Sequence, residues 1–185
     1  MMEIIKKATD LLKIILLVGM VLCPVVGNTA EIDISVKEPE TTYHALPKNM
    51  GRKKAAALAL DQHETLGLAV SEAFYTLAIY ENQIKIEIGH TKHQIFLQNS
   101  LKRNVCMYEE AKAHEEKHIH ISKAAMHGFK VKLEKEINEM AAAGKKDKEI
   151  AAHIKESFSN FEKKVKEAQL EFDRQDYKRI AKACQ

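Results

Sequence analysis

The chain lacks a strong excess of charge of either sign. Its 185 residues include 29 lysines and arginines against 26 aspartates and glutamates, which gives a net charge of +3. A protein that binds nucleic acid through the phosphate backbone carries a concentrated basic surface, and this composition does not provide one. The sequence therefore predicts no nucleic-acid partner.

Long apolar runs are also missing. The most apolar stretch extends from Ile14 to Val26, which is shorter than the roughly 20 residues that a membrane-spanning helix needs. A basic segment precedes this stretch and small residues follow it up to Ala30, which is the layout of a secretory signal peptide. We expect residues 1–30 to be removed after Ala30, or alternatively after Gly27, so that the protein is periplasmic or secreted and meets the membrane only through this segment.

Cysteine is scarce, with three residues in the whole chain. Cys23 lies in the predicted signal peptide and is lost with it, so the exported chain retains Cys106 and Cys184. An even number of cysteines in an exported protein favours disulfide formation, because the compartments outside the cytoplasm are oxidising. The sequence therefore predicts one disulfide between these two residues.

Proline and glycine, which interrupt helices, are nearly absent from the second half of the chain. Val105 to Met140 contains no proline and one glycine, and its apolar residues recur at steps of three and four. This pattern predicts a long helix that Asn104 caps and Gly144 ends. A second apolar stripe, which Asp147 can cap, predicts another helix, so the two form an antiparallel hairpin that turns near residue 145.

Alternating polar and apolar residues predict strands in the first half of the chain. Glu31–Lys37 fits a half-buried strand, and Gln83–Gly89 with Gln94–Leu97 fits a hairpin. His90 and His93 flank the turn of that hairpin, and we expect them to be surface residues of a loop.

Three further segments of this half give weaker patterns. Residues 38–50 fit a loop, residues 51–61 fit a short helix, and residues 64–80 begin like a strand and then fit a strand or a helix equally well. The predicted fold class is α+β, with a small antiparallel sheet packed on the long helical hairpin.

The first predicted helix carries the motif His114-Glu115-Glu116-Lys117-His118. Residues four apart on a helix lie one above the other, so the two imidazoles can bind one Zn²⁺. Zinc lowers the pKa of a bound water from about 15.7 towards about 7, and Glu115 can then accept its proton. The longer metzincin motif is absent, because position 124 is alanine. The alternatives are a charged helix face with two chance histidines and a pair of core histidines with ordinary hydrogen bonds.

The hairpin also predicts which residues face each other. In an antiparallel hairpin the numbers of facing residues have a constant sum, here about 290 for a turn near residue 145. Cys106 and Cys184 obey this rule, which supports their disulfide. The rule places residues 171–177 opposite the two histidines, and we expect Asp173 to be the third metal ligand, with Glu171 and Asp176 as rivals. Tyr177, one turn after Asp173, can donate a hydrogen bond to a developing oxyanion.

These motifs resemble those of a group of small exported bacterial proteins regarded as zinc-dependent proteases. The similar segments cover roughly residues 83–185 and are Ile84–Gly89, Gln94–Leu97, Asn104–Tyr108, His114–His118 and Phe172-Asp173-x-x-x-Tyr177 before Cys184. The resemblance implies that His114 and His118 are zinc ligands and that Glu115 is the catalytic base. It also implies one zincin-like domain over residues 31–185, with a strand-rich part in 31–103 and the helical hairpin in 104–185.

Motif, compartment and resemblance together predict an exported zinc metallopeptidase that acts on a peptide or protein substrate. The alternative is a non-enzymatic zinc-binding or scaffold protein of the cell envelope, in which the hairpin holds Zn²⁺ for structure or storage. A fourth protein ligand on the metal would favour this alternative, whereas an open fourth position would favour the enzyme.

Overall fold

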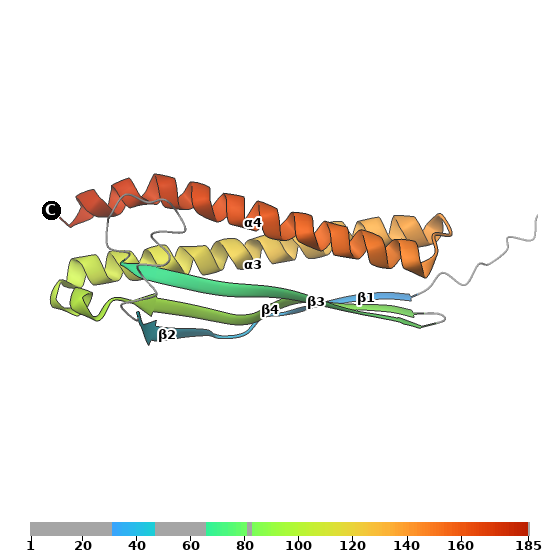
Figure 1. The fold of residues 1–185 in the computed structure, drawn as a ribbon, viewed down its shortest axis with the longest axis horizontal. Helices are drawn as coiled ribbons and strands as arrows, with labels where there is room; N and C mark the ends of the chain where they lie inside the picture. The colour runs from blue at the N-terminus through green and yellow to red at the C-terminus, as the bar shows by residue number, and fades with distance from the viewer. Residues whose placement is uncertain (1–30, 47–65, 81–82, 185) are drawn as a thin grey trace, which may run out of the picture.

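A computed structural model describes residues 31–46, 66–80 and 83–184 of the chain. These residues form two layers, a four-stranded sheet and a pair of long helices that covers one face of the sheet (Figure 1). The predicted signal peptide over 1–30 and the predicted short helix over 51–61 lie outside the described residues. No helix of the described part is long and apolar enough to cross a membrane.

The two helices form the predicted antiparallel hairpin. Helix α3 spans Val105–Ala142 and helix α4 spans Asp147–Ala183, and α4 returns along α3 (Figure 1). The Asn104 side chain caps α3 by accepting a hydrogen bond from the Met107 backbone N–H at 3.2 Å. Gly144 adopts a φ of +68°, which allows the chain to turn after α3. Asp147, the expected cap of α4, is instead its first residue, and the preceding Lys146 occupies the cap position.

A disulfide between Cys106 and Cys184 joins the start of α3 to the end of α4, as the sequence predicts. The two cysteines are 78 residues apart in sequence. A crosslink that closes a loop of this size stabilises a fold by about 2–4 kcal/mol, because it restricts the unfolded chain. The disulfide therefore fixes the open end of the hairpin, while Gly144 and its neighbours form the other end.

The sheet is mixed, so the prediction of an antiparallel sheet is wrong in part. Strand β4 spans Gln83–Leu97 and lies at its centre, with β3, Gly67–Tyr80, antiparallel on one side. On the other side β1, Glu31–Lys37, and β2, Thr41–Ala45, lie one after the other, both parallel to β4. An alternating pattern identifies a strand and its buried face, but it is the same for either strand direction.

Strand β4 is continuous where the sequence predicts a hairpin turn. His90 pairs with Ala73 and Lys92 with Glu72, so Thr91 is an additional residue that forms a β-bulge. The antiparallel hairpin is instead made by β3 with β4. Two further predictions change in this region: β2 lies within the expected loop over 38–50, and residues 67–80 are strand throughout. A short 3₁₀ helix over Asn99–Arg103 then leads into α3.

The bulge turns both histidines of β4 towards the helices, so their predicted surface position is wrong. Side chains three positions apart normally lie on opposite faces of a strand, but the additional residue places His90 and His93 on the same face. Only 2% of His90 and 1% of His93 is exposed. Sequence alternation cannot reveal this reversal, because a bulge changes the facing of every residue after it.

These histidines belong to a polar layer that divides the core, formed by Ser71, His90, His93 and Ser122. On β4 the layer lies between Ile88 and Ile95, which belong to two separate apolar clusters. Ser71 on β3 and Ser122 on α3 hold the same intermediate position on their elements. The Ser71 hydroxyl lies 2.9 Å from His93 Nδ1, while His90 Nδ1 and His93 Nε2 have no hydrogen-bond partner among the described residues.

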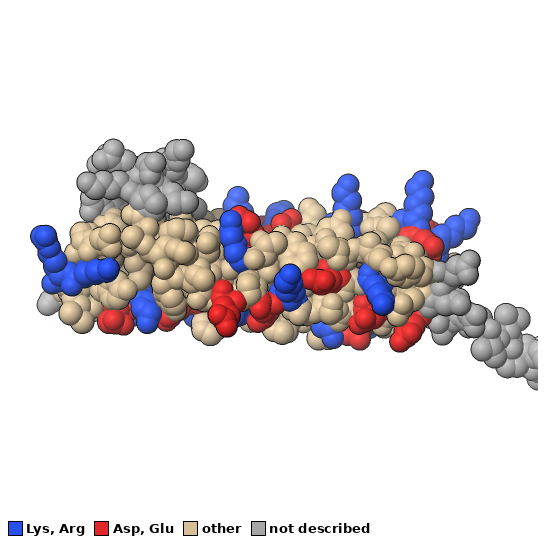
Figure 2. Space-filling model, turned by 90° about the horizontal axis from the view of Figure 1, so that it is seen from below, with Lys and Arg blue, Asp and Glu red and all other residues tan. Residues whose placement is uncertain are grey.

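The face of the molecule on which the sheet lies shows basic and acidic side chains interspersed (Figure 2). No region of this face gathers charges of one sign (Figure 2). The arrangement agrees with the nearly balanced composition of the chain. It offers no concentrated basic surface of the kind that a phosphate backbone attracts.

The polar layer makes stability dependent on pH. Burial lowers the pKa of His93 to about 4 and also lowers the pKa of His90. An imidazole whose pKa is lower in the folded than in the unfolded chain leaves stability intact above pH about 6.5 and reduces it as the pH falls towards 4. We expect the free energy of unfolding in urea to fall between pH 6.5 and pH 4 by up to about 1.4 kcal/mol per pH unit for each imidazole.

The matched measurement uses His93→Gln, which keeps a polar side chain that does not titrate. This variant should lose part of the dependence on pH between 6.5 and 4, whatever its stability at pH 7. A slope equal to that of the wild type would show that His93 carries no part of the effect.

Candidate metal centre

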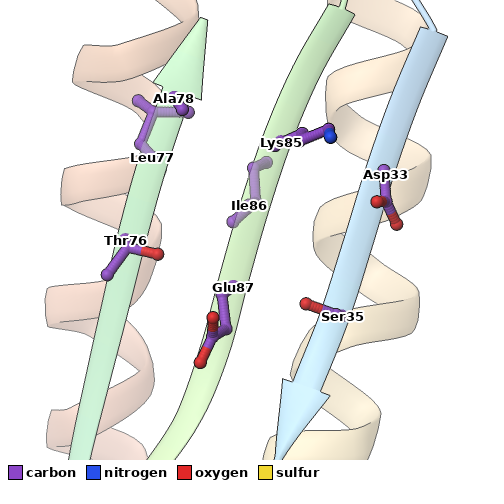
Figure 3. Close-up of a pocket in the computed structure, with 8 residues that line it drawn as sticks. All are labelled: Asp33, Ser35, Thr76, Leu77, Ala78, Lys85, Ile86 and Glu87. Atoms are coloured by element: carbon purple, nitrogen blue, oxygen red, sulfur yellow. The ribbon is translucent and has the colours of Figure 1, made fainter.

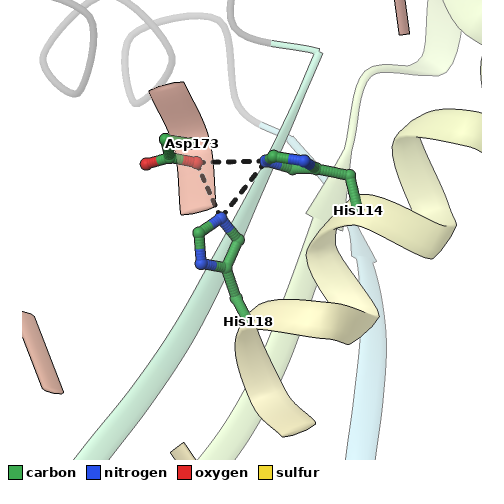
Figure 4. Close-up of side chains that lie close together, drawn as sticks. All are labelled: His114, His118 and Asp173. Carbon is green, nitrogen blue, oxygen red and sulfur yellow. Dashed lines mark hydrogen bonds and ion pairs between the residues drawn. The ribbon is translucent and has the colours of Figure 1, made fainter. Parts of the chain in front are cut away.

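Helix α3 turns His114 and His118 towards α4, and Asp173 of α4 meets them (Figure 4). Asp173 Oδ1 lies 2.8 Å from His118 Nε2 and 3.1 Å from His114 Nε2. The two Nε2 atoms lie 3.2 Å apart. Both imidazoles are buried, with 5% of His114 and 4% of His118 exposed. The structure thus brings together the three predicted metal ligands.

The separations between these three atoms fit a zinc ion after a small outward movement. In a tetrahedral site with zinc–ligand bonds of about 2.0–2.1 Å, two ligand atoms lie roughly 3.3 Å apart. Two imidazoles and one carboxylate form a donor set of catalytic zinc sites, which leave one position for water. Within the described ranges, no fourth His, Cys, Asp or Glu side chain joins this group. The cluster can therefore hold a metal ion.

The two rival ligands take other positions. Asp176 Oδ2 lies 2.8 Å from Nδ1 of His114, the ring nitrogen that does not face Asp173. The Glu171 carboxylate instead accepts hydrogen bonds from Arg174 and Gln175 of its own helix. Tyr177 lies on α4 as expected, but its side chain is outside the described part of the structure, so its predicted role stays a prediction.

Hydrogen bonds to carboxylates govern the pKa of the first histidine. Burial of the His114 ring acts to lower its pKa, but the hydrogen bonds to Asp173 and Asp176 outweigh burial and raise it. The hydrogen bond from the Arg179 guanidinium lowers the pKa of Asp176. Asp176 is therefore a carboxylate at neutral pH. Protons compete with a metal ion for His114, as they do for any imidazole ligand.

Phe172 is a site residue that sequence reasoning assigned only to the apolar core. Its ring stacks on His114 at a centroid distance of 4.9 Å and meets the edge of His118 at 5.1 Å. The signal was present, because the pairing rule places residue 172 opposite His118. An aromatic ring in contact with both imidazoles restricts their rotation and keeps water from this side of the cluster.

Glu115 lies on the side of α3 that faces the start of β3, and only 3% of it is exposed. A Cβ atom at Gly67 would lie 2.7 Å from Glu115 Cγ and 2.8 Å from Glu115 Oε1, which is too close for either atom to remain in place. Glu115 Oε2 has no hydrogen-bond partner among the described residues. Gly67 is thus a second residue that sequence reasoning missed, although a glycine in an apolar strand often marks a close approach.

The second glutamate of the motif has a different environment. Glu116 Oε1 accepts a hydrogen bond of 2.6 Å from the Tyr43 hydroxyl, and Lys112 forms an ion pair with it at 3.6 Å. The hydrogen bond to Glu116 raises the pKa of Tyr43 to about 12. Glu116 therefore belongs to the side of α3 near β2, and Glu115 is the carboxylate of the motif that is enclosed between helix and sheet.

The described structure also has an open depression of about 220 Å³ over strands β1, β4 and β3 (Figure 3). Its lining residues are Asp33, Ser35, Thr76, Leu77, Ala78, Lys85, Ile86 and Glu87. None of them belongs to the metal centre. We therefore assign this depression no part in the chemistry of the site.

Comparisons of the chain with protein-family models, with curated proteins and with solved structures found no match. The resemblance to exported zinc-dependent proteases therefore remains a prediction.

The close contact at Gly67 leads to a stability prediction. Gly67→Ala should destabilise the fold by about 1–3 kcal/mol, because the added methyl group must displace a buried side chain. Gly128→Ala is the control, since a Cβ at Gly128 of α3 meets nothing within 4 Å. Replacing a helical glycine by alanine should stabilise the fold by roughly 0.5–1 kcal/mol. Urea unfolding of both variants provides the measurement.

A double-mutant cycle identifies the cause. In a Glu115→Ala background the contact is removed, so Gly67→Ala should then cost much less than in the wild type. An equal cost in both backgrounds would mean that Glu115 is not the side chain that requires a glycine at position 67.

Proposed function

We propose that the protein is an exported zinc metallopeptidase in which His114, His118 and Asp173 hold the ion and Glu115 is the general base. The observation that carries this proposal is the convergence of two Nε2 atoms and one carboxylate oxygen within 2.8–3.2 Å of one another, from two antiparallel helices. The absence of a fourth such ligand among the described residues supports a site with a position for water.

A zinc ion at this position supplies a Lewis acid and lowers the pKa of water, which makes a nucleophile available at neutral pH. The chain's own contribution is to hold the ligands and move the proton. The Glu115 carboxylate accepts the proton of the attacking water and passes it to the nitrogen of the leaving amine. Its burial between α3 and β3 limits the positions that the carboxylate can occupy. Tyr177 is the proposed hydrogen-bond donor to the carbonyl oxygen.

Strand β3 supports a peptide as the substrate. In the described part of the structure β3 pairs only with β4, so its other edge presents backbone N–H and C=O groups without a strand partner. The Gly67 end of this strand adjoins Glu115. An extended peptide that adds to this edge as a further strand gains main-chain hydrogen bonds without needing a particular sequence. Such a peptide would pass close to the proposed base.

The burial of the metal centre supports the second candidate, a non-enzymatic zinc-binding or scaffold protein. Only 6% of the His114 side chain, 5% of the His118 side chain and 12% of the Asp173 side chain are exposed. A substrate needs access to the metal, whereas an ion held for structure or storage does not. The two candidates therefore differ in whether Glu115 performs chemistry.

Variants of the motif separate these roles. We expect about one zinc ion per wild-type chain in elemental analysis and a large loss in His118→Ala, which removes a ligand. Glu115→Gln should keep its zinc, because it changes no ligand, and should cut a mixed peptide library about 10²-fold more slowly or worse. Glu116→Gln is the matched control, because Glu116 faces Tyr43, and it should keep both zinc and activity.

Each departure from this pattern has a specific meaning. Unchanged zinc in His118→Ala would contradict the metal centre itself. A wild-type protein that binds zinc and cuts no peptide, or a Glu115→Gln variant that cuts equally fast, would favour the scaffold. Loss of zinc from Glu115→Gln would make Glu115 a ligand.

We also propose that residues 1–30 direct export and are then removed. The disulfide supports this proposal, because disulfides persist in oxidising compartments. Intact-mass analysis of the protein recovered outside the cytoplasm should show a chain that begins after Ala30 or after Gly27 and has no free thiol. A full-length chain, or one confined to the cytoplasm, would contradict export.

A further inference from the structure

We infer that Asp176 is a positioning residue, which holds the His114 ring with its proton on Nδ1 and its Nε2 lone pair directed at the metal position. Arg179 and Glu110 in turn hold Asp176 in place. The role in metal binding rests on the proposed function, whereas the contacts that carry the inference belong to the chain itself.

Two carboxylates of α4 hold opposite sides of one imidazole. Asp173 Oδ1 lies 3.1 Å from Nε2 of His114, and Asp176 Oδ2 lies 2.8 Å from Nδ1 of the same ring. The two nitrogens of an imidazole direct their bonds away from each other, so an ion bound at Nε2 is out of reach of Asp176. The spacing of three residues along α4 puts the two aspartates about one helical turn apart, which is sufficient to span the ring.

The contact with Asp176 selects one tautomer. A carboxylate can only accept a hydrogen bond, so the proton of this contact lies on Nδ1. A neutral His114 with its proton on Nδ1 has its lone pair on Nε2, where a metal ligand needs it. His118 has no equivalent support, because its Nδ1 is buried without a hydrogen-bond partner among the described residues. The two ligands of the motif are therefore supported differently.

Arg179 fixes the direction of the Asp176 carboxylate. Its Nε donates to Asp176 Oδ1, its Nη2 lies 3.2 Å from Asp176 Oδ2, and its Nη1 donates to Glu110 Oε2. Glu110 lies on α3, one turn before His114. The contacts therefore form a closed path from α3 through Arg179 and Asp176 of α4 back to α3. About half of the Arg179 side chain is exposed, so this path contributes more to orientation than to stability.

Asp176→Asn tests the inference because it keeps the size of the side chain. The Arg179 donors should attract the amide oxygen, which turns the amide NH₂ group towards Nδ1 and removes the acceptor for its proton. Asp173 then draws the proton to Nε2, and the lone pair moves to Nδ1. We expect long-range ¹H–¹⁵N spectra of the metal-free variant to show neutral His114 protonated at Nε2, whereas the wild type is protonated at Nδ1.

Zinc affinity provides the second readout. Competition with a chelator should show zinc binding about 10–100-fold weaker in Asp176→Asn than in the wild type. Glu171→Gln is the matched control, since it removes one negative charge from the same helix at a residue that contacts Arg174 and Gln175. This control should retain both the wild-type tautomer and an affinity within about twofold of the wild type. Arg179→Gln should weaken zinc binding less than Asp176→Asn does, because it removes only the support of the carboxylate.

The outcomes separate the inference from the proposed function. Weaker binding with an unchanged tautomer would overturn the inference, because Asp176 would then act through its charge or as a ligand. An unchanged tautomer and an affinity equal to that of Glu171→Gln would overturn it as well. If the wild type binds no zinc, the proposed function fails, and the spectra of the metal-free chain still decide the role of Asp176. If circular dichroism shows that Asp176→Asn does not fold, Arg179→Gln replaces it, and a wild-type tautomer and affinity in that variant overturn the support by Arg179.

Discussion

The register between α3 and α4 is the constraint on which the metal centre depends. Four contacts cross the helix pair at this end: Cys106 with Cys184, Glu110 with Arg179, His114 with Asp176, and His118 with Asp173. Their members on α3 are spaced four residues apart, so they follow one face of the helix. A covalent bond fixes the first contact, and the constant rise of the two helices carries its alignment to the other three.

This part of the structure was predictable from sequence because helix geometry is regular. Spacings of three and four residues, a nearly proline-free run and the glycine at the turn define the hairpin, and the hairpin predicts the disulfide and the position of Asp173. The separate roles of Asp173 and Asp176 were not predictable. Both residues lie within the predicted window, and only the side-chain contacts show which nitrogen of His114 each one meets.

The sheet was less predictable because its determining features are not periodic. Parallel pairing of β1 and β2 with β4 depends on where the chain travels between strands, which local alternation does not record. One additional residue at Thr91 reverses the facing of all that follows, so His90 and His93 are core residues and not loop residues. Gly67 has a similar dependence on tertiary structure, since its reason is a side chain 48 positions later in the chain.

The positions of the three metal ligands along the chain have a consequence for the order in which the protein matures. His114 and His118 are neighbours even in an unfolded chain, but Asp173 is 55 residues beyond His118. An ion that meets the unfolded chain finds two donors, and the third arrives only after the chain has paid the loop-closure entropy of the hairpin. Metal capture is therefore coupled to the docking of α4 and not to the formation of α3. The disulfide closes the same hairpin, so oxidation of the two cysteines prepares the chain for the ion by lowering that entropic cost in advance.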